Sequence, residues 1–327
     1  MRFRHSICAA FFFISVTFHT SAQTTILVPA WKPGFAAFYL VRLKTDRDIK
    51  AKSAFALPQI PNEAKIEVSG ILRVEILAGN AAAPGEVRLR SHFLYLLSDI
   101  GALQRGKKPD QSEVQQISPD NKYVDCTLRA DGQIAQISGL DQLATEQQSA
   151  WREWAARFSA AFLIETEARK RGAKWNSEQP ETSPSPIAGL FWQERSHYVH
   201  DEPCAPVKFN SSREPQRSTT SESCAVILTA ASLVQKSSSQ DATPEDYKLR
   251  GLHTRGTVKG ANETILYISR KTGQLVRATQ DAKQQMDVQI ALVNGTNQLH
   301  YTVTASANST VELVTELPFN LQPRSKQ

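Results

Sequence analysis

Nine consecutive residues from Ser196 to Cys204, with the sequence SHYVHDEPC, bring together two imidazoles, two carboxylates and a thiol. On a helix, Glu194, His197 and Asp201 would share a face, and a Glu-x-x-His pair is one way to begin a metal site. The flanking aromatic residues and a closing proline favour a strand instead. On a strand, His197 and His200 point to opposite faces. We therefore expect no metal here and treat both histidines only as weak candidates for metal ligands.

The cysteines predict one disulfide. Cys204 and Cys224 are the natural pair, because the segment between them is polar, holds two prolines and cannot form a core of its own. A bridge across a loop of this length stabilises a fold by roughly 3 kcal/mol in the chain-entropy estimate. Cys126 stands in an alternating run with Val124 and Leu128 on the same strand face. We expect it to be a buried, unreactive thiol.

Catalytic motifs that can be recognised by spacing are absent from the chain. It has no G-x-S-x-G, H-E-x-x-H or C-x-x-C motif and no phosphate-binding glycine loop. The sequence therefore assigns no catalytic residue, no metal site and no cofactor. We interpret the protein as non-catalytic and keep a hydrolase as an alternative.

One long helix is expected over residues 141–171. Either Thr145 with Gln148 or Asp141 would cap its start, and Gly172 offers a left-handed stop. Large rings recur three or four residues apart along one face, namely Trp151, Trp154, Phe158 and Phe162. This stripe either packs against a sheet as filled core or lines an apolar cleft that holds an acyl chain or another lipophilic ligand. The sequence leaves both interpretations open.

Two β-rich regions flank the helix. The N-terminal β region spans residues 23–140 and the C-terminal one residues 194–327, with the helix in 141–175 and a linker rich in Pro, Ser and Glu over 176–193. Both β regions alternate with a period of two, and Thr272-Gly273 and Asn294-Gly295 indicate hairpin turns. A further polar turn is expected over 281–284. The two regions either form separate sheets or join into one.

The first 22 residues have the three parts of a secretory signal peptide: Arg2 and Arg4, an apolar run, and a small-residue cleavage site ending at Ala22. No later segment is apolar enough over enough residues to span a membrane as a helix. The formal net charge of the 327 residues is +6, but the cations are scattered among acids. We therefore expect no nucleic-acid partner.

The chain resembles two groups of bacterial envelope proteins. The segments Trp151-Arg152-Glu153-Trp154 and Cys224-Ala225-Val226-Ile227-Leu228 resemble those of uncharacterised secreted β-rich families. The arrangement of long antiparallel strands around an aromatic helix is similar to the lipoprotein-carrier superfamily. There a half-barrel sheet closes over a helix and holds acyl chains. The resemblance implies a periplasmic or secreted bacterial protein.

Taken together, these patterns predict an α+β fold, mainly β. Long antiparallel meanders would form a curled sheet or sheets packed on one central helix. The expected function is an exported envelope protein that binds or carries a lipophilic ligand, with Trp151, Trp154, Phe158 and Phe162 as ligand-binding residues. The alternatives are a structural or partner-binding module of the cell envelope and, as above, a hydrolase. The expected partner is therefore a lipophilic small molecule or an envelope protein.

Overall fold

A computed structural model describes most of the chain. The described residues are 33–53, 63–78, 86–103, 113–117, 122–129, 134–162, 171–181, 185–209, 214–296 and 298–318. The predicted signal peptide lies outside them. No helix among the described residues is long and apolar enough to cross a membrane.

The described chain is mainly β, as predicted. Its strands are β1 (Ala36–Ser53), β2 (Glu63–Ile76), β3 (Val87–Leu103), β4 (Glu113–Ile117), β5 (Val124–Leu128), β6 (Ile134–Ser138), β7 (Lys174–Pro180), β8 (Leu190–Cys204), β9 (Val207–Phe209), β10 (Pro215–Arg217), β11 (Glu222–Gln235), β12 (Leu252–Ser269), β13 (Leu275–Leu292) and β14 (Leu299–Glu316). The helices are the 3-10 turn η1 (Leu140–Gln142), α1 (Thr145–Phe162) and α2 (Glu245–Leu249).

One sheet holds all of these strands. Its main path runs β6-β5-β3-β2-β1-β14-β13-β12-β11-β8-β7, and each neighbouring pair on that path is antiparallel. The first and last long strands meet at its centre, where β1 pairs with β14 from Phe38 to Ser53. The N-terminal and C-terminal β regions therefore form a single sheet rather than two.

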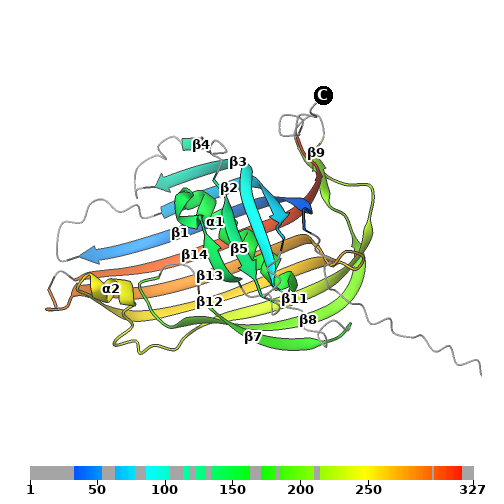
Figure 1. The fold of residues 1–327 in the computed structure, drawn as a ribbon. Helices are drawn as coiled ribbons and strands as arrows, with labels where there is room; N and C mark the ends of the chain where they lie inside the picture. The colour runs from blue at the N-terminus through cyan, green and yellow to red at the C-terminus, as the bar shows by residue number, and fades with distance from the viewer. Residues whose placement is uncertain are drawn as a thin grey trace, which may run out of the picture.

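The sheet curls around α1 (Figure 1). A single core cluster contains Cys126 from β5, near one end of the strand path, and Tyr198 from β8, near the other end. The same cluster contains Trp151, Trp154 and Phe158 of α1. Strands so far apart in the path can share a core only because the sheet is strongly curved. We call the face that meets α1 the concave face and the opposite face the convex face.

The helix differs from its predicted extent. Residues 140–142 form a separate 3-10 turn, so the α-helix begins at Thr145 rather than Asp141. The predicted pair of Thr145 with Gln148 does not form the cap. Gln147 Oε1 accepts the backbone N–H of Ala144 at 3.0 Å, and Gln148 Nε2 donates to the carbonyl of Leu143 at 3.0 Å. The helix is described as far as Phe162 and has 18 residues, and residues 163–170 lie outside the described chain. The expectation of one long helix over 141–171 is therefore wrong at its start, and α2 is a second, short helix.

Two further expectations about connections are wrong. The linker expected over 176–193 contains most of β7, which pairs with β8 from Lys174 to Pro180. Its polar composition is that of an edge strand, which is exposed along one side. The turn expected over 281–284 lies in the middle of β13, where both neighbouring strands satisfy its backbone. By contrast, the turns containing Gly273 and Gly295 are present, and both glycines have positive φ.

Candidate functional site on the concave face

The SHYVHDEPC segment forms the second half of β8, and a β-bulge changes which way its side chains point. His197 pairs with Leu228 and His200 with Val226, while Val199 has no partner on β11. Leu228 and Val226 are two residues apart and share a face, so the two histidines also share one. The prediction that they lie on opposite faces is therefore wrong, because sequence alternation does not reveal the extra residue of a bulge.

The reactive groups of this segment are nevertheless divided among separate partners. His200 Nε2 lies 2.9 Å from Glu202 Oε2 on the convex face. Tyr198 is buried in the core, and its hydroxyl donates to Asp201, which also pairs with Arg270. Burial and then the bond to this carboxylate raise the pKa of Tyr198. Among the described residues, no group of three or more His, Cys, Asp or Glu side chains is placed to hold a metal ion.

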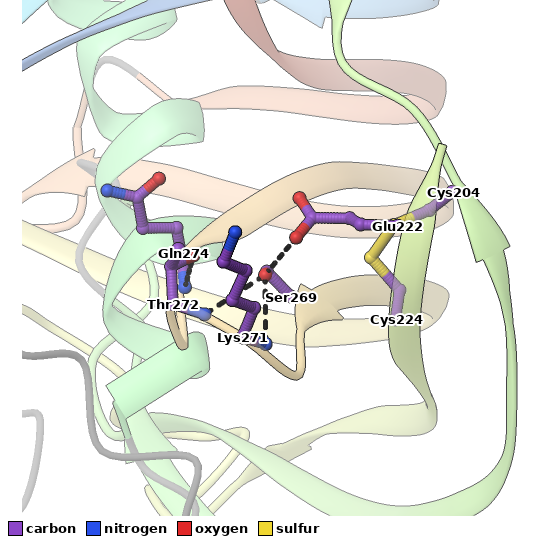
Figure 2. Close-up of a disulfide and its surroundings, with 7 residues drawn as sticks. All are labelled: Cys204, Glu222, Cys224, Ser269, Lys271, Thr272 and Gln274. Carbon is purple, nitrogen blue, oxygen red and sulfur yellow. Dashed lines mark hydrogen bonds between the residues drawn. A yellow bond between two sulfur atoms is a disulfide. The ribbon is translucent and has the colours of Figure 1, made fainter. Parts of the chain in front are cut away.

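The predicted disulfide between Cys204 and Cys224 is present, with the two Cα atoms 5.7 Å apart. Figure 2 shows it beside the turn that joins β12 to β13. The Ser269 hydroxyl donates to Glu222 at 2.5 Å and accepts the backbone N–H of Lys271 and of Thr272. The bridge thus closes the β8–β11 connection at the rim of the sheet. A disulfide is typical of proteins in oxidising compartments.

A threonine, a histidine and an aspartate also meet near α2. Thr243 Oγ1 lies 3.1 Å from His253 Nδ1, and Asp241 Oδ1 lies 3.7 Å from the same nitrogen. A general base in a nucleophilic triad uses one ring nitrogen for each partner, whereas here both partners meet Nδ1. Thr243 Oγ1 also accepts the backbone N–H of Thr254 at 3.0 Å. This cluster therefore anchors a loop and does not form a hydrolase site.

The aromatic stripe of α1 faces the sheet, as predicted. Trp151, Trp154 and Phe158 are each 1% exposed. The rings of Trp154 and Phe158 stack at 4.8 Å between centroids, and the ring of Tyr39 meets that of Phe158 edge-on at 5.9 Å. In the described structure these rings fill the core between helix and sheet. Phe162 is the last described residue of the helix, and its side chain lies outside the described part of the chain.

Polar atoms are also buried where α1 meets the sheet. Trp151 Nε1 donates to Ser91 Oγ at 2.9 Å. Tyr39 Oη, Trp154 Nε1 and Ser309 Oγ are buried without a hydrogen-bond partner among the described residues. A buried polar group left unpaired costs roughly 1–3 kcal/mol. The rings of α1 therefore make apolar contacts with the sheet, while several polar atoms buried beside them lack a hydrogen-bond partner in the described chain.

The concave face extends well beyond α1. Strands β12, β13 and β14 each have 18 residues, about 60 Å of extended chain, whereas the 18 residues of α1 span about 27 Å. The concave row of each strand consists of every second residue, from Thr254 to Leu266 on β12, from Ala278 to Ile290 on β13 and from Leu299 to Val311 on β14. These rows include no Asp, Glu, Lys or Arg. The concave face is therefore uncharged along nearly the whole length of the central strands.

The convex face of the same strands is densely charged. Its charged residues include Arg255, Lys259 and Glu263 on β12, Asp281, Lys283 and Asp287 on β13, and Glu312 on β14. On β1, Lys44 Nζ lies 2.6 Å from Glu67 Oε1, with both side chains about half exposed. The convex face thus meets water.

A second apolar cluster lies farther along the concave face, at the end near α2. It contains Ile187, Leu190, Leu233, Ala242, Val258 and Val288, with Trp192, Met286, Ile290 and Tyr301 packed against it. Gly260 makes room for the indole of Trp192, because a Cβ there would lie 3.2 Å from Cη2 of that ring. Between the two clusters the concave face carries small or neutral side chains, including Ala282, Gln284 and Ala305.

An open hollow of about 520 Å³ lies where β1, β2, β13 and β14 run side by side. Its lining consists of Asp46, Arg47, Asp48, Glu63, Ala64, Lys65, Lys283, Gln284, Gln285, Thr304, Ala305 and Ser306. Successive residues of a strand point to opposite faces, so this lining includes positions from both faces. Its mixed charge makes it unlike the apolar cleft that the aromatic stripe predicts.

The buried thiol is also on the concave side of the core. Cys126 is 4% exposed, and burial raises its pKa to about 12. A thiol held in its neutral form is a poor nucleophile. This agrees with the unreactive cysteine expected from the strand pattern.

Comparisons with known proteins give no assignment. No protein family and no curated protein matches the chain. Among solved structures, a CymD monoaromatic hydrocarbon channel aligns with 7% sequence identity over 90% of this chain and 93% of that one. Its TM-score is 0.16, which is too low to support a conclusion about fold or function.

Proposed function

We propose that this protein is an exported, non-catalytic protein of the bacterial cell envelope that binds or carries a lipophilic ligand on its concave face. The observation that carries the proposal is the uncharged concave face of β12, β13 and β14, which is about twice as long as the described part of the helix that packs on it. Ligand sites are concave, mostly apolar and lined by aromatic residues. The disulfide and the predicted signal peptide favour a periplasmic or secreted location.

In this proposal α1 belongs to the core and can also be displaced from the concave face by a ligand. Its rings supply apolar contacts for a ligand, since Trp154 and Phe158 face the same surface as Tyr39. The unpaired Tyr39 Oη and Trp154 Nε1 weaken its docking relative to a fully satisfied core. A lipophilic molecule that reaches this interface would replace apolar contacts of the buried rings with contacts of its own, which offsets the loss of their burial against the sheet.

Native mass spectrometry tests the proposal. The full chain would be exported into an oxidising compartment and purified without detergent. We expect a bound species of lipid mass that is lost in Trp154→Ala and in Phe158→Ala. The matched control is Phe191→Ala, which removes an aromatic ring on the convex face, where Lys236 Nζ lies 4.1 Å from the ring centroid.

The outcomes separate the interpretations. A wild-type protein that carries no lipid, and takes up none from added vesicles, would reject the carrier proposal. Lipid retained equally by all three variants would show that the aromatic stripe is not the site. Circular dichroism of each variant would confirm that loss of the ligand does not merely report unfolding.

A second candidate is a module that binds a protein partner, and one observation favours it. In the described chain β6 ends the strand order, and Ile137 on this edge is 45% exposed. An exposed apolar edge strand is a template for pairing with another chain. The same spectra would report it as an added mass of protein size that disappears in Ile137→Lys.

A further inference from the structure

The concave rows of the five strands β1, β2, β12, β13 and β14 carry one isolated cation. On the described residues of β1, β2, β12, β13 and β14, the positions in register with the core include a single charged side chain, Arg47. It lies on β1 four residues beyond Leu43 and two beyond Thr45, both of which are buried. No bulge interrupts the pairing of β1 with β14 or β2. Arg47 therefore stays on the concave face.

The cross-strand neighbours of Arg47 on the concave face are small and neutral. It pairs with Ala305 on one side and Ala64 on the other, and beyond Ala305 the same row continues through Gln284 to Gly260. Such side chains leave space above the sheet for a bound molecule.

No acidic group of the described chain neutralises Arg47. It is exposed, and within the described residues it has no ion-pair partner. The acids beside it in sequence, Asp46 and Asp48, point to the convex face, where Asp48 lies 3.8 Å from Lys50. Arg47 is thus a cation without an ion-pair partner in the described chain, and the concave rows of the four neighbouring strands β2, β12, β13 and β14 carry no other charge.

An arginine in this position is suited to an anionic head group. Guanidinium binds carboxylate or phosphate oxygens through two parallel hydrogen bonds. A tail laid along the apolar strand would also exclude water from the ion pair and so strengthen it. From Arg47 toward α1, the strand passes Leu43 and reaches Val41, which is fully buried, after about 20 Å. A single long acyl chain can span that distance.

We propose that Arg47 binds the carboxylate or phosphate of a single-chain anionic amphiphile, whose tail lies along the concave face toward α1. This inference rests on the proposed function and specifies its ligand class. It assigns the head group to the middle of β1 and the tail to the apolar surface between Leu43 and the aromatic stripe.

Isothermal titration calorimetry with three probes of equal chain length tests the inference. The probes are dodecanoate, dodecyl phosphate and the uncharged methyl dodecanoate. We expect wild-type protein to bind both anions roughly tenfold more tightly than the ester. Arg47→Gln should lose that preference while its affinity for the ester stays unchanged. The control, Lys50→Gln, removes a cation from the convex face of the same strand and should behave as wild type.

The outcomes distinguish the role of Arg47 from the proposed function on which it rests. Wild type that binds all three probes equally, or Arg47→Gln that keeps the preference for anions, would overturn the role of Arg47 and leave lipophile binding intact. Equal loss of the preference in Lys50→Gln would overturn it too, because the effect would then be general charge attraction. Wild type that binds none of the probes would reject the proposed function itself. A difference between the two anions would identify the head group.

Discussion

The two faces of the central strands differ sharply in charge. On β13, Val288 is fully buried on the concave face, and its neighbours Asp287 and Gln289 are exposed on the convex face. Successive side chains of each 18-residue strand thus lie in two different environments, one on each face of the sheet. The convex face of β12 and β13 is rich in charged residues, whereas the concave rows of the three central strands have none. The contrast confines the charge of these three strands to one face of the sheet.

The largest expected effect comes from placing a charge on the concave face. Val288→Asp should lower the free energy of unfolding by roughly 4–5 kcal/mol, because the carboxylate would be buried without a partner. The matched control, Gln289→Asp, moves the same charge by one residue to the convex face and should change stability by less than about 0.5 kcal/mol. Urea unfolding of both variants measures the difference. Similar losses in the two would contradict the assignment of faces.

Removing the disulfide should lower the free energy of unfolding by less than Val288→Asp does. The double variant Cys204→Ala, Cys224→Ala frees a loop with a sequence separation of 20 residues and should lose roughly 3 kcal/mol. The bridge lies on the convex face, so its loss should leave the concave core intact. Unfolding in urea would measure the stability, and near-ultraviolet circular dichroism would follow Trp151 and Trp154. A collapsed tryptophan signal at low urea would show that the two faces are coupled more tightly than we expect.

A smaller effect concerns alkaline pH. The thiol of Cys126 has a folded-state pKa of about 12 against an ordinary value of 9.0. Between these two pH values the unfolded chain releases the proton and the folded chain keeps it, so stability falls as pH rises from 9 toward 12. Urea midpoints measured across this range should fall less steeply in Cys126→Ala. An identical slope in the two proteins would show that the thiol is not held neutral by the core.

The smallest effect is expected for a surface ion pair. Lys44 and Glu67 face each other across β1 and β2 on the convex face, at 2.6 Å between Nζ and Oε1. Exposed pairs of this kind contribute little. Lys44→Gln should therefore leave the thermal midpoint unchanged at moderate salt. A clear decrease that vanishes at high salt would show that charge on the convex face stabilises the sheet.

Much of the architecture follows from local patterns. The alternation in Val124-Asp125-Cys126 places the thiol in the core, and the glycines at 273 and 295 end strands where a positive φ is needed. The spacing of Trp151, Trp154 and Phe158 gave the buried face of α1 correctly, because a helical stripe depends only on nearby residues. Cys204 and Cys224 were paired correctly because the loop between them offers no core of its own.

The errors arise where tertiary contacts override local signals. The polar run 281–284 has the composition of a turn, but β12 and β14 pair with it on both sides and keep it extended. The bulge at Val199 reverses the side-chain alternation that separated His197 from His200. Residues 176–180 have the composition of a linker, yet β8 offers them a free strand edge.

The candidate site itself was only half visible in the sequence. The aromatic stripe on α1 was recognised, but Arg47 and the uncharged rows beside it were missed. Arg47 is one of many scattered cations until the pairing of β1 with β14 and β2 is known. A scan of each strand for the face that lacks charge would have found the uncharged rows, and a lone arginine within them would then have been apparent.

The sequence by itself indicated most of the strands, the helical stripe, the disulfide and the expectation of export, because each depends on the types and spacing of nearby residues. Only the tertiary structure decided that the two β regions form one curled sheet, since the pairing of Phe38–Ser53 with Leu299–Val314 joins residues about 250 positions apart. That long-range pairing places Arg47 beside Ala305 and turns alternating residues on separate strands into one continuous uncharged face.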